Sequence, residues 1–572
     1  MRKIFLIHIL LLIGVNNFAQ VNFGWAKSIG SPNADQGNAI VADASGNIYV
    51  TGYFWGTTDF DPGPGIYVLS SSSPQDIFVC KLNNLGNLVW ARNFAPSGGG
   101  AGTSVFVDAL GNVYTTGYFG GTADFDPGAG TYTLNASGSS DIFINKLNSA
   151  GLFVWTKQLA CVGTATCNDI KVDAGSNVLL TGSFNISIDL NPGPSVLTYT
   201  TNSSWDDDIF VVKLDPSGNL TWAKTIGGSG PDAGTTIIEK TSGDLLLSGY
   251  YRFNADFDPG PSTFTVVANG IDDIFILQLD GSGNFVWAKS MGGPGYDRAH
   301  GMTIDASNNI YTTGYFNGTS DFDPSVASFT LSTSGSFTDD DIFVSKLDPN
   351  GNFIWAKQMG GPSNSDQGNS ITLDALGNVY TTGRYLYTGD FDPGPGTYTM
   401  TSVGSAACAF VSILDPSGNF SWAGGWGAAA DAWGECITID NAYNIYTTGP
   451  YRGKTDFDPS PSSFTLMPQG GFDIFIHKLG QSSLGIKDIS FNHSIGIYPN
   501  PNSGEFKLKI EKEIENAELI LINSLGQKVY DQRIFKGVNY IRVSGISAGL
   551  YNYILLEDDQ KFDSGKVIIN EN

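Results

Sequence analysis

The amino-acid sequence predicts an all-β protein built from repeated four-stranded units, and three observations support this. Glycine accounts for 72 of the 572 residues, about twice its usual share, and charged residues make up only 15%, where about 25% is typical. Apolar residues alternate in short runs with a period of two rather than recurring at helical spacing. Tryptophan marks a long internal repeat. Together these features favour strands over helices.

The first twenty residues have the pattern of a secretory signal peptide. Two basic residues, Arg2 and Lys3, precede an apolar run at 4–15, and small and polar residues follow to position 20. This run is too short for a membrane-spanning helix. We therefore expect residues 1–20 to be removed and the mature chain, which has no apolar stretch approaching 18 residues, to lie outside the cytoplasm.

Residues 21–480 contain one unit copied seven times. A glycine that follows a small hydroxyl residue recurs at a nearly constant interval, and an aspartate lies seven positions after it in every copy, as at Gly52 and Asp59. A second marker has steps of 65 to 68 residues and consists of Trp25, Trp90, Trp155, Trp222, Trp287, Trp355 and Trp422. Two markers with one spacing indicate a single structural unit.

Each unit is predicted to form four antiparallel strands, named a to d in order. In the first copy, strand a ends at the turn 43–47, strand b covers 47–54, strand c covers 76–82, and strand d carries the repeat tryptophan. Compact Asp-x-x-Gly-Asn turns join a to b and c to d, since Asp caps the turn and Gly accepts a positive φ. Seven such sheets in series predict a seven-bladed β-propeller.

The two ends of the repeat region complement each other. The chain begins with a tryptophan strand at 21–28 that has no strand c before it, and the last copy stops after its strand c at 473–479. If the first strand docks as strand d of the last blade, two exposed edges disappear. We therefore expect a propeller closed by its N-terminal strand.

Two segments resemble a known repeat family. The phrases Asp-Ala-Ser-Gly-Asn-Ile-Tyr-Val-Thr-Gly at 43–52 and Gly-Asn-Leu-Val-Trp-Ala at 86–91 are similar to the seven-bladed β-propeller repeats abbreviated SBBP. The resemblance spans roughly residues 21 to 480. That family is defined by its architecture, so the resemblance implies a fold and no single activity.

A second domain follows the repeats. Residues 21–487 contain two glutamates, whereas residues 488–572 contain seven. A polar linker at 481–494 leads to alternating strands at 495–572, which predict a small β-sandwich.

The tail resembles the type A C-terminal sorting domain of the type IX secretion system, which directs cargo across the outer membrane of Bacteroidota. The residues that carry this resemblance are Tyr498, Pro499, Asn500, Pro501, Gly526, Gly549, Tyr551 and Lys566. The resemblance implies that the type IX machinery is a partner of this domain. It also implies removal of the tail after export, leaving the propeller secreted or attached to the cell surface. The alternative is a generic adhesive β-sandwich.

Charge and cysteine content narrow the range of partners. The net charge of −25 would repel a phosphate backbone, so nucleic acid is not expected as a partner. We expect the protein to be a monomer and to have no membrane-spanning segment. The five cysteines are scattered, and only Cys161 and Cys167 are close enough to suggest a local disulfide.

Antiparallel strands place the b–c and d–a connections together on one face, which we call the top face. These connections are long, and functional residues often lie in long connections on a rigid scaffold. Exposed aromatic residues there could stack on a sugar or contact a protein, or they could merely pack the connections onto the blades. The candidate ligand-binding residues are Trp55, Trp205, Asp297, Arg298, His300, Trp426, Trp433 and Glu435.

The residue inventory argues against an enzyme. Only His300 and His477 lie in the propeller, so a multi-histidine zinc site is excluded. A carboxylate-dependent hydrolase stays as an alternative, because His300 lies with Arg298 and Asp297 in one top connection and Glu435 lies in another. A purely structural or adhesive surface element is the other alternative to a binding protein.

Calcium is the one cofactor that the sequence suggests. In the repeated Asp-Phe-Asp-Pro motif two carboxylates lie two positions apart and point to the same side of an extended segment, where they could begin a calcium site. The alternative is that each Asp caps its own turn. The residues are Asp59, Asp61, Asp124, Asp126, Asp189, Asn191, Asp256, Asp258, Asp321, Asp323, Asp390, Asp392, Asp456 and Asp458.

Overall fold

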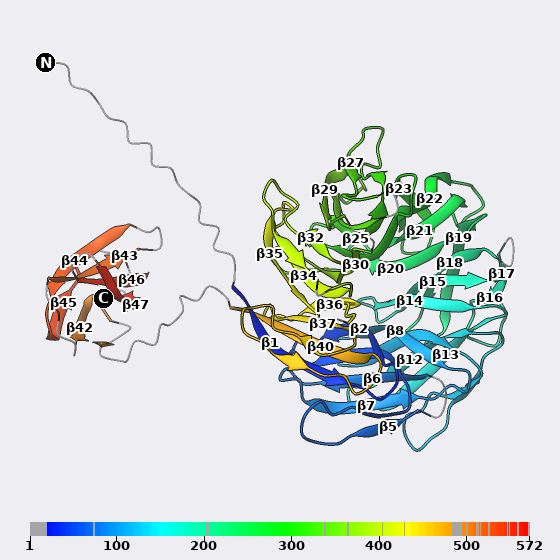
Figure 1. Cartoon of the computed structure of the whole chain (residues 1–572), viewed down its shortest axis with the longest axis horizontal. Coiled ribbons are helices and arrows are strands. Elements are labelled where there is room, and N and C mark those ends of the chain that lie inside the picture. Colours follow the sequence, from blue (N-terminus) through cyan, green and yellow to red (C-terminus); the bar gives the residue numbers. More distant parts are fainter. Residues whose placement is uncertain are drawn as a thin grey trace, which may run out of the picture. The chain divides into compact units, whose positions relative to one another are not determined.

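The computed structural model describes two parts of the chain. The first is 20–482, apart from 72–74, 202–204, 337–338, 363–364, 403 and 428–429; the second is 495–569, apart from 499–501, 511–513, 515, 524–526, 546, 548 and 558–559. They belong to two compact units, each made of strands and shown in Figure 1. The expected signal peptide, except Gln20, and most of the expected linker lie outside the described residues.

The large unit repeats one four-stranded antiparallel sheet. In its first copy, strands a to d are β2 (Gln36–Ala42), β3 (Ile48–Phe54), β6 (Asp76–Leu82) and β7 (Leu88–Phe94), paired in that order. The next copies are β8 (Gly100–Val107), β9 (Val113–Phe119), β12 (Asp141–Leu147) and β13 (Phe153–Cys161); β14 (Ala165–Val172), β15 (Val178–Asn185), β18 (Asp207–Leu214) and β19 (Leu220–Gly228); and β20 (Ala233–Glu239), β21 (Leu245–Asp256), β22 (Thr265–Leu279) and β23 (Phe285–Met291).

The remaining copies keep the same order. They are β24 (Arg298–Ile304), β25 (Ile310–Asn317), β28 (Asp340–Leu347) and β29 (Phe353–Met359); and β30 (Gln367–Leu373), β31 (Val379–Tyr385), β34 (Cys408–Leu414) and β35 (Phe420–Trp426). The last sheet runs β36 (Cys436–Ile439), β37 (Ile445–Tyr451), β40 (Asp473–Ser482) and β1 (Gln20–Ile29). The first strand of the chain therefore lies in the predicted place, antiparallel to the last strand c, with Trp25 opposite Lys478.

Strand a is the innermost strand of each copy. Each strand a contacts the strand a of the next copy, from β2 through β8, β14, β20, β24 and β30 to β36, and β36 in turn contacts β2. Figure 1 shows these strands toward the middle of the large unit. The predicted all-β fold of propeller-like repeat sheets is confirmed.

The repeat tryptophan links neighbouring sheets. The indole Nε1 of Trp90 donates a hydrogen bond to the Ser149 carbonyl, at 3.2 Å, in the c–d turn of the next copy. That turn needs a glycine for two reasons. Gly151 has a φ of 72°, and a Cβ atom there would lie 2.8 Å from Cδ2 of Trp90.

The b–c connections contain small hairpins that the sequence did not predict. In the first copy β4 (Thr57–Asp59) pairs with β5 (Val68–Ser70), and Phe60 just after β4 is fully buried. The other separate hairpins are β10 (Thr122–Asp124) with β11 (Thr133–Asn135), β16 (Ser187–Asp189) with β17 (Thr198–Thr200), β26 (Thr319–Asp321) with β27 (Thr330–Ser332), β32 (Thr388–Asp390) with β33 (Thr399–Thr401) and β38 (Thr455–Asp456) with β39 (Thr465–Leu466).

The small unit contains two antiparallel sheets around one apolar core. One sheet has the order β41 (Ile495–Tyr498), β42 (Glu505–Ile510) and β45 (Gly537–Arg542); the other has the order β44 (Lys528–Ile534), β43 (Ala517–Ile522), β46 (Gly549–Glu557) and β47 (Gln560–Ile569). Leu508 of the first sheet and Leu519 of the second are both fully buried in that core. This arrangement is the predicted small β-sandwich.

The sorting-motif residues are only partly described. Tyr551 is buried, and its hydroxyl donates a hydrogen bond of 2.6 Å to the Ser547 carbonyl, whereas Tyr498 is 44% exposed. Gly549 begins β46, and Lys566 pairs with Asn552 through the strand register. Pro499, Asn500, Pro501 and Gly526 lie outside the described residues.

Two expectations concern membrane spans and disulfides. In the described ranges, no helix is long and apolar enough to cross a membrane. All five cysteines are free. The Sγ atoms of Cys161 and Cys167 contact the backbone oxygens of Asn185 and Asp169 instead of each other, so the suggested disulfide is wrong for this structure.

Candidate functional site

A ring of cross-strand pairs lies where strands a and b meet the top face. In each pair, a residue at or near the start of strand a faces the residue that follows the repeat glycine of strand b. We call these positions the rim. They are Gln36 with Tyr53, Ala101 with Tyr118, Thr166 with Ser183, Ala233 with Tyr250, Arg298 with Tyr315, Gln367 with Arg384 and, through a backbone hydrogen bond, Trp433 with Pro450.

Rim side chains from neighbouring copies contact one another. The guanidinium carbon of Arg298 lies 4.0 Å from the centre of the Tyr250 ring in the preceding copy, close enough for a cation–π contact. Nε of Arg298 also donates to Oδ2 of the fully buried Asp272 at 2.8 Å. Nε of Arg252 donates to the other oxygen of Asp272 at 2.6 Å. This part of the rim is therefore aromatic, charged and held in place.

A second polar network joins the fifth and sixth copies. Nη2 of Arg384 donates to Oε1 of Gln367 at 3.0 Å, and Nε2 of Gln367 donates to Oδ2 of Asp340 at 2.8 Å. Across the last and first copies, Oε1 of Glu435 accepts hydrogen bonds from Nε1 of Trp433 at 2.7 Å and from Nε2 of Gln36 at 3.0 Å. The bonds to Glu435 therefore join the two ends of the repeat region.

Below the rim, one residue of strand a bulges toward the next copy. The bulge interrupts the a–b register in the first six copies, as between Gly37 and Ala39. Its side chain donates a hydrogen bond to a backbone carbonyl of the neighbouring strand a in five copies. The donors are Asn38, Thr103, Asn168, Thr235 and Asn369. We call these positions the belt.

His300 occupies the belt position of the fifth copy, and Glu435 occupies the equivalent position of the seventh, where it directly precedes β36. Burial lowers the pKa of His300 to about 4, so this imidazole is neutral at pH 7, and its ring lies edge-on to Tyr315 at 5.3 Å. Burial raises the pKa of Glu435. A carboxylate accepts hydrogen bonds but does not donate them, so Glu435 breaks the donor pattern of the belt next to Arg384.

Four of the candidate residues from sequence belong to these two sets of positions: Arg298 and Trp433 to the rim, and His300 and Glu435 to the belt. Asp297 does not join them. It is fully buried, where it accepts hydrogen bonds from the Gly293 amide at 2.6 Å and the Ser320 hydroxyl at 2.7 Å. These bonds fix the d–a connection, so Asp297 stabilises the scaffold beneath the rim.

The expectation that Trp426 is an exposed top-face aromatic is wrong. Trp426 is only 2% exposed, and its ring centre lies 4.3 Å from that of His477. It lies four residues after the repeat tryptophan Trp422, a position that holds a buried apolar residue in every other copy. Those residues are Ile29, Phe94, Leu159, Ile226, Met291 and Met359.

Trp55 and Trp205 lie on the outer connections. They are 45% and 86% exposed, and the Trp55 amide donates to Oδ1 of the buried Asp35 at 2.8 Å. Their role in ligand binding stays a prediction. Sequence reasoning missed the rim tyrosines and Arg384, although a signal was available: in each copy the rim residue directly follows the repeat glycine.

The Asp-Phe-Asp-Pro motif caps its own turn. Oδ1 of Asp59 accepts hydrogen bonds from the amides of Asp61 at 3.0 Å and Tyr67 at 2.8 Å, and Oδ1 of Asp61 accepts one from Gly63 at 2.8 Å. The other six copies repeat these bonds, with Asn191 in place of the second Asp in the third. Turn capping therefore accounts for the repetition of the motif.

Calcium binding at this motif stays a prediction. Within the described ranges, no group of three or more His, Cys, Asp or Glu side chains is arranged to hold a metal ion, so loop carbonyls and water would have to complete the coordination. The check is thermal unfolding of the propeller with millimolar calcium and with a chelator. An upward shift that is lost in Asp59→Asn would support calcium, and equal midpoints would leave the motif as turn chemistry.

Pairs of buried aspartates lie between neighbouring copies. One aspartate lies in strand c, and the other lies in the following d–a connection. The backbone of that connection donates a hydrogen bond next to the pair, as from the Asp297 amide to the Asp272 carbonyl at 2.9 Å. A Cβ atom on Gly292 would lie 2.7 Å from Oδ1 of Asp273 and 3.0 Å from Oδ2 of Asp297. The pairs are Asp208 with Asp232, Asp273 with Asp297, Asp341 with Asp366 and Asp473 with Asp35.

These pairs have unusual proton affinity. Burial, reinforced by the neighbouring carboxylate, raises the pKa of Asp297 to about 7 and that of Asp366 to about 8. Burial likewise raises the pKa of Asp273 to about 6 and that of Asp473 to about 7. Each pair therefore retains protons at a pH where an ordinary aspartate has lost its own.

Three junctions between copies lack such a pair. Gly100 and Ala165 stand in the d–a position beside Asp76 and Asp141, and Cys408 with Ala432 replaces both members between the sixth and seventh copies. In the last d–a connection Asp431 does not take the place that Asp35 and Asp297 have elsewhere, because it is the Ala432 amide that donates to the Ala407 carbonyl before strand c, at 2.9 Å.

Comparison with known families agrees with both units. Residues 24–61 and 354–384 match the family described as a beta-propeller repeat, and residues 496–570 match the family described as a secretion system C-terminal sorting domain. The repeat and sorting-domain resemblances are thus confirmed. The sorting domain indicates secretion to the cell surface or outside the cell and implies interaction with the secretion machinery.

Individual relatives are distant. A protein of Acanthamoeba polyphaga mimivirus, named uncharacterized WD repeat-containing protein L264, is 24% identical over 450 residues, which cover 68% of this chain and 32% of the relative. The chain thus spans about a third of that protein's length.

Two solved structures were compared with the whole chain. A fungal alcohol oxidase in complex with copper is 11% identical, with 97% of this chain and 100% of that chain covered, at a TM-score of 0.37. PorZ, a surface component of the type IX secretion system of Porphyromonas gingivalis, is 10% identical, with 96% and 100% covered, at a TM-score of 0.17. At such scores neither likeness carries an argument.

Proposed function

We propose that this exported propeller binds a carbohydrate at the rim of its top face and catalyses no reaction on it. The observation that supports this most is the residue after the repeat glycine, which is tyrosine in four copies and arginine in a fifth. Tyr53, Tyr118, Tyr250 and Tyr315 are all half-buried. Each therefore presents part of a rigid ring while its scaffold holds it in place.

The polar partners of these rings suit a hydroxyl-rich ligand. Arg298, Arg384, Gln367, Gln36 and Glu435 supply charged or amide donors and acceptors around the same ring of strands. Aromatic and arginine side chains in fixed positions are the usual source of affinity at binding surfaces. Charged hydrogen bonds to a sugar hydroxyl add both energy and orientation.

Hydrolysis of a glycoside requires a second carboxylate facing the first across the scissile bond. Two carboxylates that contact rim side chains, the buried Asp272 and the half-buried Asp340, are bound to Arg298 and Gln367. Glu435 is bound to Trp433 and Gln36. These carboxylates are therefore suited to fixing rim side chains and not to proton transfer.

The test is a glycan-binding array on the mature protein, followed by titration of the best sugar against rim variants. We expect Tyr250→Ala and Tyr315→Ala each to weaken binding by about tenfold, about 1.4 kcal/mol. Tyr132→Ala is the matched control, because Tyr132 is a 39% exposed tyrosine that stacks on Phe153, away from the rim. Equal loss in the control would contradict rim binding. Turnover of a glycan that Glu435→Gln abolishes would contradict the absence of catalysis.

Deleting residues 495–572 is expected to leave the propeller folded but retained in the periplasm. No sheet among the described residues mixes strands of the two units, so the propeller loses no sheet pairing, while the sorting domain is lost. Cell fractionation with circular dichroism of the recovered protein measures both outcomes. A truncated protein that still reached the medium or the cell surface would contradict the role of the tail.

A further inference from the structure

The junction between the sixth and seventh copies differs from the others and leaves a pocket on the top face. Cys408 and Ala432 stand where paired carboxylates stand elsewhere, and a Cβ atom on Gly427 would lie 2.2 Å from Sγ of Cys408. The sulfur therefore fills the space between the strands. With no carboxylate at position 432, the connection is fixed in another way.

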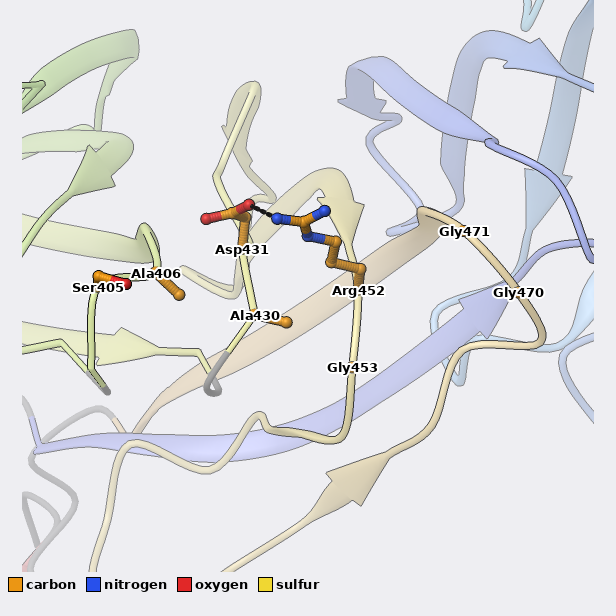
Figure 2. Close-up of a pocket in the computed structure, with 8 residues that line it drawn as sticks. All are labelled: Ser405, Ala406, Ala430, Asp431, Arg452, Gly453, Gly470 and Gly471. Carbon is orange, nitrogen blue, oxygen red and sulfur yellow. Dashed lines mark hydrogen bonds and ion pairs between the residues drawn. The ribbon is translucent and has the colours of Figure 1, made fainter.

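Asp431, one residue earlier, faces outward instead. Its Oδ1 accepts a hydrogen bond from the Ala407 amide at 3.0 Å, and its Oδ2 forms an ion pair with Nη2 of Arg452. Figure 2 shows this ion pair between the segment that carries Ala430 and Asp431 and the segment that carries Arg452 and Gly453. Arg452 is 51% exposed, so its guanidinium is available to a ligand.

The pocket beside this ion pair has a volume of about 550 Å³, within the range of small-molecule sites. Its lining consists of Ser405, Ala406, Ala430, Asp431, Arg452, Gly453, Gly470 and Gly471. These residues provide a hydroxyl, an ion pair and backbone amide groups but no large apolar wall. Such a lining does not suit an apolar ligand and suits one rich in hydroxyl groups.

Two aromatic rings connect the pocket to the rim. The guanidinium carbon of Arg452 lies 5.2 Å from the centre of the Phe472 ring, and that ring lies 5.2 Å from the ring of Trp433. Trp433 in turn donates its hydrogen bond to Glu435. Phe472 and Trp433 are both half-buried, so a chain-like ligand on the rim can extend over them toward Arg452.

We propose that this pocket is a second subsite for the same ligand, which makes the ligand an oligosaccharide rather than a single sugar. This inference rests on the proposed carbohydrate binding at the rim. One unit contacts the rim, the chain passes over Trp433 and Phe472, and a more distant unit places its hydroxyls against Arg452, Asp431 and Ser405.

The experiment measures binding of the mature protein to glucose, mannose and xylose and to their linear β-1,4-linked hexasaccharides by calorimetry. Arg452→Ala is expected to weaken the best hexasaccharide about tenfold and to leave its monosaccharide unchanged. Lys454→Ala is the matched control. It also removes one positive charge, but Lys454 lies two residues after Arg452 and its side chain does not line the pocket. Ser405→Ala tests the pocket without any change of charge and should also weaken only the hexasaccharide.

The outcomes separate the two proposals. If the sugars bind but Arg452→Ala and Ser405→Ala leave the hexasaccharide affinity unchanged, or weaken both sizes equally, the subsite is wrong and rim binding stands. If none of the sugars binds while the protein shows its normal unfolding transition, binding of these sugars at the rim fails and the subsite fails with it.

Discussion

The propeller is expected to lose stability as the pH rises from 5 to 8.5, with a fall in unfolding free energy of at least about 3 kcal/mol. The cause is the set of buried aspartate pairs. Because the folded-state pKa values of Asp297 and Asp366 are raised to about 7 and about 8, the native state binds more protons than the unfolded state above about pH 4. Protons bound to these aspartates stabilise the folded protein at low pH. This stabilisation is lost as the pH rises through the pKa that each aspartate has in the folded state.

The expected fall in unfolding free energy follows from the size of the pKa shifts. One pKa unit corresponds to about 1.4 kcal/mol, so a shift of two units in a single group already gives about 3 kcal/mol. At acid pH the aspartates that cap the turns have the opposite effect on stability. Although burial opposes it, hydrogen bonds from Asn47 and Ser45 hold the pKa of Asp43 below its usual value. Stability from such groups is lost as the pH falls through their folded pKa, so a maximum near pH 4 is expected.

Urea unfolding followed by tryptophan fluorescence at several pH values measures this profile. Asp297→Ala places an alanine beside Asp273, as Ala165 lies beside Asp141 in the native chain. It should reduce the fall in unfolding free energy between pH 5 and 8.5. Its overall stability should be lower, because the hydrogen bonds from Gly293 and Ser320 are lost. Asp280→Asn is the control, because hydrogen bonds from Asn284 lower the pKa of Asp280 and this group is ionised throughout that range. An unchanged slope in Asp297→Ala would show that the pairs do not hold the protons.

Damage to the N-terminal strand is expected to destabilise the propeller strongly. Ile29 of β1 is 1% exposed in a core shared with the first sheet, and the hydroxyl of Tyr451 donates to Oγ of Ser28 at 2.7 Å. Ile29→Ala should lower the unfolding free energy by about 2–5 kcal/mol. Deleting 20–29 should cost more and expose the edge of β40, which favours aggregation.

Val89→Ala is the matched control for the strand. Val89 also lies on a strand d, but its side chain is 51% exposed, so its truncation should change the unfolding free energy by less than about 0.5 kcal/mol. Denaturation of the three proteins, with light scattering for the deletion, compares them. A deletion variant as stable and monomeric as the intact chain would mean that pairing between β1 and β40 contributes nothing to the fold.

Spacing in the sequence predicted the repeat sheets and the place of the first strand, because both depend on periodic burial that every copy shares. The second domain was predicted from a change in glutamate content. The site was harder to predict, since it consists of exceptions to the repeat. Glu435 and His300 could be singled out as unusual residue types, but their place in a belt of side-chain donors depends on a bulge that only the strand register shows.

The position of a residue within its copy predicts the surroundings of its side chain better than the residue type does. Trp426 was mistaken for a surface aromatic because tryptophan suggests binding, whereas counting four residues from Trp422 would have placed it in the core. Tyr250 and Tyr315 were overlooked because tyrosine beside a repeat glycine looks like ordinary strand composition.

The pairing of the first strand with the last strand c also sets the order in which the molecule can be completed. Trp25 and Lys478 face each other, so this contact joins parts of the chain about 450 residues apart, and the entropic cost of such closure grows with the logarithm of the separation. Every other sheet can form from consecutive residues as soon as they are available. The last sheet must wait for both ends, so its assembly is the slow, concluding event of folding, and until then the β40 edge is open to pairing with a second molecule.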